Sequence, residues 1–366
     1  MTDPTLHPAP NRSFLAAALL DWYPRHRRDL PWRHTRDPYA IWLSEVILQQ
    51  TRVAQGLPYY ETFLAAYPTV HDLAAAPEAE VLRHWQGLGY YSRARNMHRT
   101  AQQLVEEYGG AFPGTYAGLL KLRGVGPYTA AAIASFAFDE AVAVLDGNVF
   151  RVLARVFGLH SDIAAPASRK EFQVLADQHL PPAHAAEFNQ AIMEFGALQC
   201  TPNKPDCLFC PVRENCWAFQ HGQVAILPIK SKAKAARTRY FHYFVLRHEG
   251  KVYLRERGEK DIWQGLYDFA LAETQSADLP PAELARHLAA FGAELDTAQL
   301  QEPAPPSAAR HLLSHQKLEV RFHAFELEKP LPASTLRDLG LRAYSPTEVE
   351  DLPKPVLIDT YLKSGR

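Results

Sequence analysis

The sequence predicts a two-part protein, with a mainly α-helical N-terminal region that carries a cysteine loop and an α+β C-terminal region. Three observations support this prediction. Segments rich in alanine and leucine with helical periodicity dominate as far as residue 222, and alternating apolar runs typical of strands begin near residue 240. All 4 cysteines lie between Cys200 and Cys216.

The change in sequence character sets the expected domain boundaries. We expect residues 1–222 to form the helical domain, residues 223–237 a basic linker and residues 238–366 the α+β domain. In the first domain, helical periodicity covers 14–23 and 38–53. In the second, 240–247 and 251–255 are expected strands, 281–291 is an expected helix, and a further strand is expected around Val320.

Composition narrows the class of protein. With 366 residues, 47% hydrophobic and 22% charged, the chain is typical of a globular protein, and it lacks an apolar run long enough to span a bilayer. Residues 1–12 lack the apolar core of a signal peptide, so we expect a cytoplasmic protein without membrane contact. The net charge of −1 gives no overall attraction to nucleic acid, so any DNA contact must come from local groups.

The four cysteines form a compact set of candidate ligands. Cys200, Cys207, Cys210 and Cys216 are separated by six, two and five residues. A disulfide framework spreads its cysteines along a small secreted chain, whereas one clustered loop suits a metal or iron–sulfur centre in a reducing compartment. Structural zinc normally uses two short Cys-x-x-Cys pairs, and this loop has one. An iron–sulfur cluster is therefore favoured, and zinc or unrelated buried thiols remain the alternatives.

A glycine turn at Gly124-Val125-Gly126 lies between two apolar helical segments. The glycines allow positive φ and a close backbone approach, and Pro127 suits the first position of the next helix. The free amides at such a helix start can bind a phosphate. We expect a helix-hairpin-helix that holds a DNA backbone, with a plain turn between packed helices as the alternative.

A second glycine turn, Gly87-Leu-Gly89, is followed by two tyrosines and several arginines. An aromatic ring beside cations can enter a duplex while the arginines hold phosphate. We expect Tyr90 to make this contact, although either Tyr90 or Tyr91 could instead belong to the core.

Two carboxyl groups have the local settings of catalytic acids. Glu45 interrupts the apolar face of the helix expected at 38–53, where desolvation should raise its pKa. Asp146 follows a short apolar run and precedes a helix. An aspartate there is commonly only a helix cap, but a capping carboxylate also stays ionised and oriented.

Six segments carry a resemblance to a known family. In order they resemble motifs of the MutY-type adenine DNA glycosylases: 30–33, 42–51, 87–91, 124–129, 145–149 and the cysteine loop. The resemblance implies a base-excision enzyme that flips adenine out of double-stranded DNA, from mispairs with 8-oxoguanine or guanine, and leaves an abasic site. We expect it to act on chromosomal DNA as a monomer.

The same resemblance implies roles for individual residues. Glu45 would protonate adenine N7 and handle the water, Asp146 would stabilise or capture the sugar cation, and Tyr128 and Asn148 would support them. The four cysteines would hold a 4Fe-4S cluster. The DNA contacts implied, besides the hairpin and Tyr90, are Trp32, Arg33, Gln49, Gln50 and Thr51.

Two alternative functions stay open. The related endonuclease III enzymes act on oxidised pyrimidines and carry a nucleophilic lysine where this chain has Tyr128, so a monofunctional glycosylase is expected here. A non-catalytic lesion-binding protein is the other alternative.

The C-terminal region resembles the Nudix-like lesion-recognition domain of the MutY family. Leu313, Ser314 and His315 match a loop that meets 8-oxoguanine, with leucine in place of the usual phenylalanine. The acidic helix of true Nudix hydrolases is not visible in the sequence. The complete expectation is a helix-hairpin-helix glycosylase domain with an iron–sulfur loop, followed by an α+β Nudix-like domain.

Overall fold

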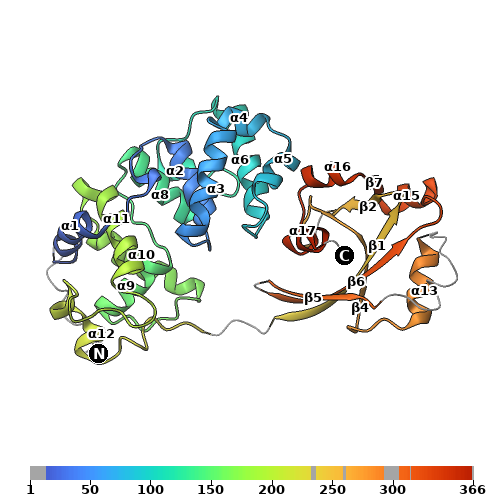
Figure 1. The fold of residues 1–366 in the computed structure, drawn as a ribbon. Coiled ribbons are helices and arrows are strands. Elements are labelled where there is room, and N and C mark those ends of the chain that lie inside the picture. The colour runs from blue at the N-terminus through green and yellow to red at the C-terminus, as the bar shows by residue number, and fades with distance from the viewer. Residues whose placement is uncertain (1–13, 232–235, 259–260, 292–304, 314, 365–366) are drawn as a thin grey trace. The chain divides into compact units, whose positions relative to one another are not determined.

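The computed structural model describes residues 14–231, 236–258, 261–291, 305–313 and 315–364. The chain forms two compact units. The first unit comprises Met1–Ala75 and Asn96–Lys232, and the second comprises Ala76–Arg95 and Ala233–Arg366. The segment 76–95, which contains the turn before Tyr90, is therefore grouped with the C-terminal part of the chain. Figure 1 draws the ribbon from blue at the N-terminus to red at the C-terminus.

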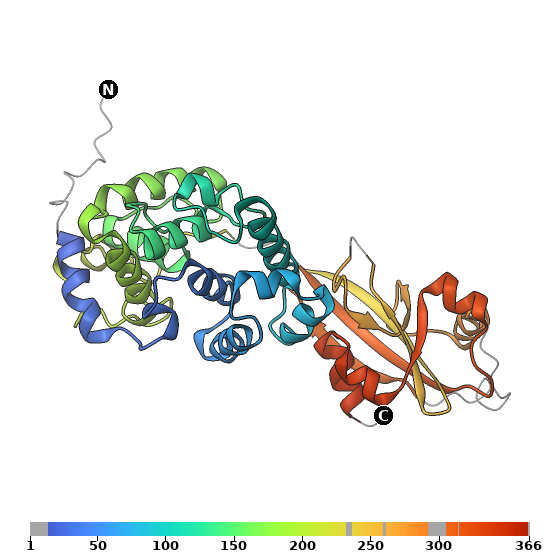
Figure 2. The same ribbon diagram turned by 90° about the horizontal axis from the view of Figure 1, so that it is seen from above.

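Helices build the first unit. They are α1 (Phe14–His26), α2 (Pro38–Leu48), α3 (Val53–Ala66), α4 (Val70–Ala75), the larger part of α6 (Ser92–Tyr108), α7 (Tyr116–Leu119), α8 (Pro127–Phe138), α9 (Gly147–Phe157), α10 (Pro166–His179), α11 (Ala185–Leu198) and α12 (Trp217–Gln220), with short 3-10 turns at Pro31–Arg33, Pro182–His184 and Arg213–Asn215. α11 packs against α1 and α9, and α2 packs against α3 and α8 (Figure 2).

One expected helix in the first unit is shorter than its periodicity indicated. The apolar pattern of 38–53 predicts a single helix, but α2 ends at Leu48 and α3 begins at Val53. Gln50, between them, has a left-handed backbone with φ 56°. The expectation of one helix is wrong because apolar periodicity continues across the turn, while the backbone reverses there.

A seven-stranded sheet and several helices build the second unit. Its elements are α5 (Glu78–His84), β1 (Arg237–His248), β2 (Lys251–Glu256), β3 (Tyr267–Asp268), β4 (Ala270–Thr274), α13 (Pro281–Ala290), β5 (Ser307–Leu312), β6 (Gln316–Glu326), α15 (Ala333–Leu339), β7 (Leu341–Tyr344), α16 (Pro346–Asp351) and α17 (Val356–Lys363). The strand order is β3-β2-β1-β6-β5, with β4 paired to β1 and β7 to β2. β1 and β6 run parallel and the other pairs antiparallel.

Helices cover both faces of this sheet. Phe244 of β1 lies in one apolar cluster with residues of α13 and α15, and its ring is 5.0 Å from that of Phe291. The neighbouring side chains point to the opposite face, where Phe322 of β6 stacks at 4.1 Å on Tyr361 of α17. The alternation along each strand thus buries both faces, and the expected α+β architecture is confirmed.

Part of the expected linker packs on the first unit. Leu227 is buried beside Cys216 and Ala218, and Ile163 N donates to Ile229 O at 3.0 Å. Residues 232–235 lie outside the described part of the chain. In the described ranges, no helix is both long and apolar enough to cross a membrane.

Candidate active site

Glu45 lies on the buried side of α2. Asp37 caps this helix by accepting from Tyr39 N at 3.0 Å, and Pro38 occupies its first position. The cap fixes the start of the helix, and Glu45 follows two turns later with only 7% of its surface exposed. A buried carboxyl needs a hydrogen-bonding partner, because an unpaired charge in an apolar setting is costly.

Tyr128 supplies that partner from the first turn of α8. Its hydroxyl donates to Glu45 Oε2 at 2.5 Å. Burial is the main cause that raises the pKa of Glu45 to about 7; the charge of Asp146 contributes to this rise, and the Tyr128 hydrogen bond and the Arg33 charge oppose it. The raised pKa expected from the sequence is confirmed. Burial also holds the pKa of Tyr128 well above its usual value, so its hydroxyl remains a donor.

Asp146 caps α9 and faces the same region. Its Oδ1 accepts from Asn148 N at 2.9 Å and from Val149 N at 2.7 Å. Burial nevertheless raises its pKa, although the capping hydrogen bonds and the Arg151 charge oppose the rise. The expected cap is present, while burial is the largest influence on the pKa of Asp146 and acts against the ionised form that the cap favours.

Asn148 links Asp146 to a residue that sequence reasoning missed. Asn148 Nδ2 donates to Asp146 Oδ2 at 2.8 Å, and Asn148 Oδ1 accepts from Arg151 Nη2 at 2.7 Å. Arg151 also donates to the carbonyls of Gly196, at 2.6 Å, and Cys200, at 2.8 Å. A side chain at Gly196 would place its Cβ 2.6 Å from Asn148 Cβ. The sequence signal was available, since Arg151 lies one helical turn after Asn148.

Arg33 and Trp32 lie inside the first unit rather than on an open surface. Arg33 donates to both carboxylate oxygens of Glu194, at 3.0 and 2.7 Å, and Arg28 binds the same carboxylate. These hydrogen bonds outweigh burial and lower the pKa of Glu194 to about 2. The ring centroids of Trp32 and Tyr60 are 5.1 Å apart. Arg33 and Trp32 also line a cavity of about 50 Å³ beside Glu45, which has room for water but not for a purine.

The predicted hairpin turn uses a positive φ at Gly124 but not at Gly126, whose φ is −87°. Gly124 has φ 71°, and a Cβ there would approach Asn96 Cβ to 2.9 Å, so glycine is required. Gly126 is exposed and caps α8, but the side chain of Val125 is buried, which leaves its backbone as the group available to a ligand.

The turn after α2 lies next to the start of α8. Gln49 Nε2 donates to Thr129 Oγ1 at 3.3 Å, so the residue after Tyr128 anchors the turn. Thr51 N donates to Leu48 O at 3.1 Å, and Gln50 is exposed. Gln50 is thus presented outward on a left-handed backbone that a side-chain-bearing residue rarely adopts.

The second unit brings Tyr90 together with the predicted lesion loop. Tyr90 is 44% exposed, whereas Tyr91 is 6% exposed, which resolves the two tyrosines into a surface and a core residue. Tyr90, Trp263, Leu313 and His315 line a cavity of about 560 Å³. Ser314 lies outside the described residues. The residues predicted to contact the lesion base therefore lie in the second unit, whereas Glu45 lies in the first.

The four cysteines follow α11 and are all free thiols. The charges of Cys200, Cys207 and Cys216 each affect the pKa of Cys210, which burial raises to about 12. In the described part of the chain, no group of three or more histidine, cysteine, aspartate or glutamate side chains is already arranged around a metal position. Because the other three thiols all influence Cys210, the four sulfurs lie within electrostatic range of one another, and four thiolates are the donor set of a 4Fe-4S cluster.

Family models match both units. An HhH-GPD superfamily base excision DNA repair protein model matches residues 43–178, and a NUDIX domain model matches residues 242–364. Both matches agree with the sequence-based expectation of a helical domain followed by a Nudix-like one.

Three curated relatives are each named adenine DNA glycosylase. The adenine DNA glycosylase of Rattus norvegicus is 36% identical over 87% of this chain and 71% of its own length. That of Buchnera aphidicola subsp. Schizaphis graminum is 33% identical over 70% of this chain and 74% of its own length. The human adenine DNA glycosylase is 47% identical over 56% of this chain and 39% of its own length.

Solved structures resemble the helical part. A thermostable thymine-DNA glycosylase superposes with a TM-score of 0.53 and 31% identity, over 57% of this chain and 97% of its own. A trapped endonuclease III–DNA covalent intermediate superposes with a TM-score of 0.50 and 25% identity, over 57% of this chain and 95% of its own. With a buried acid, a capping aspartate and a hairpin on this fold, and with relatives matched over most of their length, the chain belongs to the adenine DNA glycosylase family of the HhH-GPD superfamily.

Proposed function

We propose that this protein hydrolyses the N-glycosidic bond of adenine placed opposite 8-oxoguanine in duplex DNA, with guanine opposite adenine as a second substrate. The observation that carries the proposal is the buried pair of Glu45 and Tyr128, with Asp146 close enough to influence the same carboxyl. A carboxyl whose pKa is about 7 is part protonated at neutral pH, as a general acid must be.

The chemistry follows from the two carboxyl settings. Glu45 in its protonated form gives a proton to N7 of the flipped adenine, and the N-glycosidic electron pair then leaves with the base. The sugar is left as an oxocarbenium-like cation, which the Asp146 carboxylate stabilises. Water adds to the anomeric carbon, and its proton passes to the Glu45 carboxylate, which restores the acid.

Tyr128 makes the reaction monofunctional. Its phenol is held against Glu45 and carries no amine, so the hairpin position offers no group that could form a Schiff base with the abasic sugar. Strand cleavage should therefore require added alkali after adenine has been released.

The lesion base would be read by the second unit. The cavity lined by Tyr90, Trp263 and Leu313 is of a size that takes a ligand such as a purine base, and its aromatic lining suits stacking. His315 is exposed at the same cavity and adds a polar group.

Cys200, Cys207, Cys210 and Cys216 would hold a 4Fe-4S cluster. Such a cluster supplies structural order to the loop, and an electron-transfer capacity whose potential depends on hydrogen bonds to its sulfurs. Arg155 Nη1 donates to Cys200 Sγ at 3.4 Å, and the same atom donates to Thr201 O at 2.7 Å. These contacts join α9, which begins after Asp146, to the cysteine loop.

The test is single-turnover base release from duplexes of one sequence that differ in the central pair. Adenine opposite 8-oxoguanine should be released and the strand cut only after alkali, whereas thymine opposite guanine and thymine glycol opposite adenine should survive. Glu45→Gln keeps the shape of the side chain and removes the acid, so it should bind the lesion duplex without releasing adenine. Adenine release by Glu45→Gln at the normal rate would overturn the assignment, and lesion binding without release by the unaltered protein would favour a binding-only function.

A further inference from the structure

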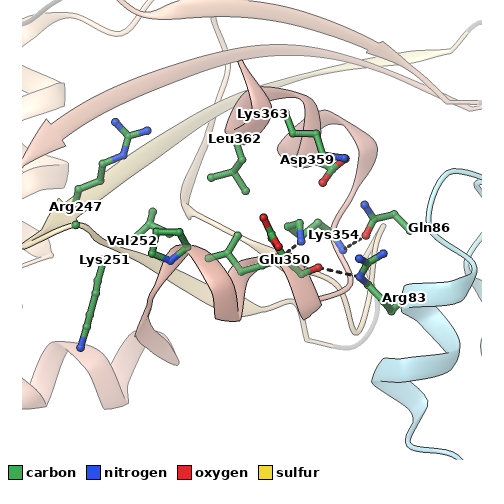
Figure 3. A pocket seen from close by; sticks show the side chains of 13 residues that line it. Arg83, Gln86, Arg247, Lys251, Val252, Glu350, Lys354, Asp359, Leu362 and Lys363 are labelled. Carbon is green, nitrogen blue, oxygen red and sulfur yellow. Dashed lines mark hydrogen bonds and ion pairs between the residues drawn. The ribbon is translucent and has the colours of Figure 1, made fainter. Parts of the chain in front are cut away.

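A second cavity in the second unit has no part in the chemistry described above. It measures about 580 Å³, and its lining includes Arg83 and Gln86 next to residues from β1, β2, α16 and α17. Figure 3 shows these side chains. The cavity shares none of its lining with the cavity beside Tyr90.

The lining carries an excess of positive charge. Its basic residues are Arg83, Arg247, Lys251, Lys354 and Lys363, and its acidic residues are Glu350 and Asp359. Asp359 and Lys363 form an ion pair, with Lys363 Nζ 2.8 Å from Asp359 Oδ2 and the lysine side chain largely exposed, so both charges count in the balance of the lining. The remaining lining is partly apolar, through Val252, Val349 and Leu362.

Lys354 is a buried basic residue of this lining. Its side chain caps the C-terminal end of α16 by donating to Val349 O and, at 2.8 Å, to Leu352 O. The residue is only 3% exposed, and burial lowers its pKa to about 8. Within that value, the charge of Asp359 opposes the lowering and the charges of Arg83 and Lys363 add to it, so all three groups lie within electrostatic range of Lys354.

Backbone contacts hold these cations in place. Arg83 Nε donates to Glu350 O at 2.9 Å, and Lys354 N donates to Gln86 Oε1 at 3.1 Å. Figure 3 places Arg83, Gln86, Lys354 and Asp359 at one end of the cavity, with Arg247 and Lys251 at the other. Because Arg83 uses its Nε for the carbonyl, the outer edge of its guanidinium is suited to a second, anionic partner.

We propose that this cavity binds a small organic phosphate of the size of a nucleoside diphosphate, with a phosphate group beside Arg83, Lys354 and Lys363. The volume lies in the range of small-molecule sites, and an apolar lining with a few convergent polar groups is typical of them. With five basic residues against two acidic ones, the lining also attracts a phosphate electrostatically. A phosphate of the DNA backbone offers the same chemistry, but it is part of a long convex duplex, whereas a small phosphate ligand can enter a cavity.

The experiment titrates the full-length, cluster-loaded protein with ADP, inorganic pyrophosphate or an undamaged 12-base-pair duplex, by calorimetry and thermal shift. Arg83→Gln should weaken ADP binding about tenfold, because one charge-assisted hydrogen bond is lost. Lys363→Gln should also weaken it, and this side chain is 76% exposed, so the variant should fold. Arg337→Gln is the matched control, with the same charge change on an exposed residue outside the cavity.

The results separate a built site from general charge. Saturable binding of ADP and pyrophosphate that falls in Arg83→Gln and Lys363→Gln but not in Arg337→Gln would support the proposal. Absence of ADP and pyrophosphate binding at low salt would overturn it, as would equal losses in all three variants. Binding of the duplex alone, weakened by Arg83→Gln, would also overturn it and assign the cations to DNA.

Discussion

Removing the hydroxyl of Tyr128 should move the pH dependence of adenine release upward. The hydroxyl donates to Glu45 Oε2 at 2.5 Å and so favours the ionised carboxylate. A hydrogen bond to a charged group contributes about 1.5–3 kcal/mol, and 1.36 kcal/mol corresponds to one pH unit, so Tyr128→Phe should raise the pKa of Glu45 by about 1–2. Since the wild-type pKa is about 7, the variant should titrate at about 8–9.

The assay is the single-turnover rate of adenine release between pH 5 and pH 10. The acid works in its protonated form, so the rate should fall above pH 7 in the wild type and only above about pH 8 in Tyr128→Phe. Tyr116→Phe, in the same apolar cluster beside α8, controls for loss of a hydroxyl without loss of the Glu45 contact. A descending limb that stays in place, or moves to lower pH, would refute the assignment of this limb to Glu45.

Three further substitutions test other parts of the site. Asp146→Asn should keep the cap of α9 but slow adenine release about 100-fold or more at unchanged DNA affinity, and an unchanged rate would leave Asp146 only a cap. Glu194→Gln should lower the free energy of unfolding by about 3 kcal/mol at pH 7, measured with urea. The carboxylate stabilises the fold above the unfolded pKa of 4.5, and this contribution is lost as pH falls through about 2, so an equal effect at pH 2 and pH 7 would contradict the ion-pair argument. Tyr90→Ser should weaken binding of the 8-oxoguanine duplex about tenfold with little change in stability, and unaltered affinity would remove Tyr90 from the lesion site.

Features controlled by neighbouring residues could be predicted from the sequence. The cap at Asp146 and the start of α8 at Pro127 follow from local backbone chemistry, and the structure contains both. The raised pKa of Glu45 was also predictable, because its position among apolar helix neighbours implies burial. Such features depend on a few adjacent residues, so a single sequence is enough to predict them.

Features that join distant segments could not be predicted. Arg33 and Glu194 are 161 positions apart, and no local pattern marks either as the other's partner. The reversal at Gln50 also lacked a signal, because glutamine is an unusual residue for a left-handed turn. The choice between Tyr90 and Tyr91 was decided by packing that the sequence does not specify.

The assignment of residues 76–95 to the second unit affects how the protein can fold during synthesis. Arg83 donates to the carbonyl of Glu350, which is 267 positions later in the chain. At the usual pace of a ribosome, α5 must wait on the order of tens of seconds for that partner. The apolar side chain of Leu82, which lies against Gly265 in the finished protein, lacks that contact in the meantime. The nascent chain therefore passes through a stage in which a helix inside its first half lacks part of its final packing.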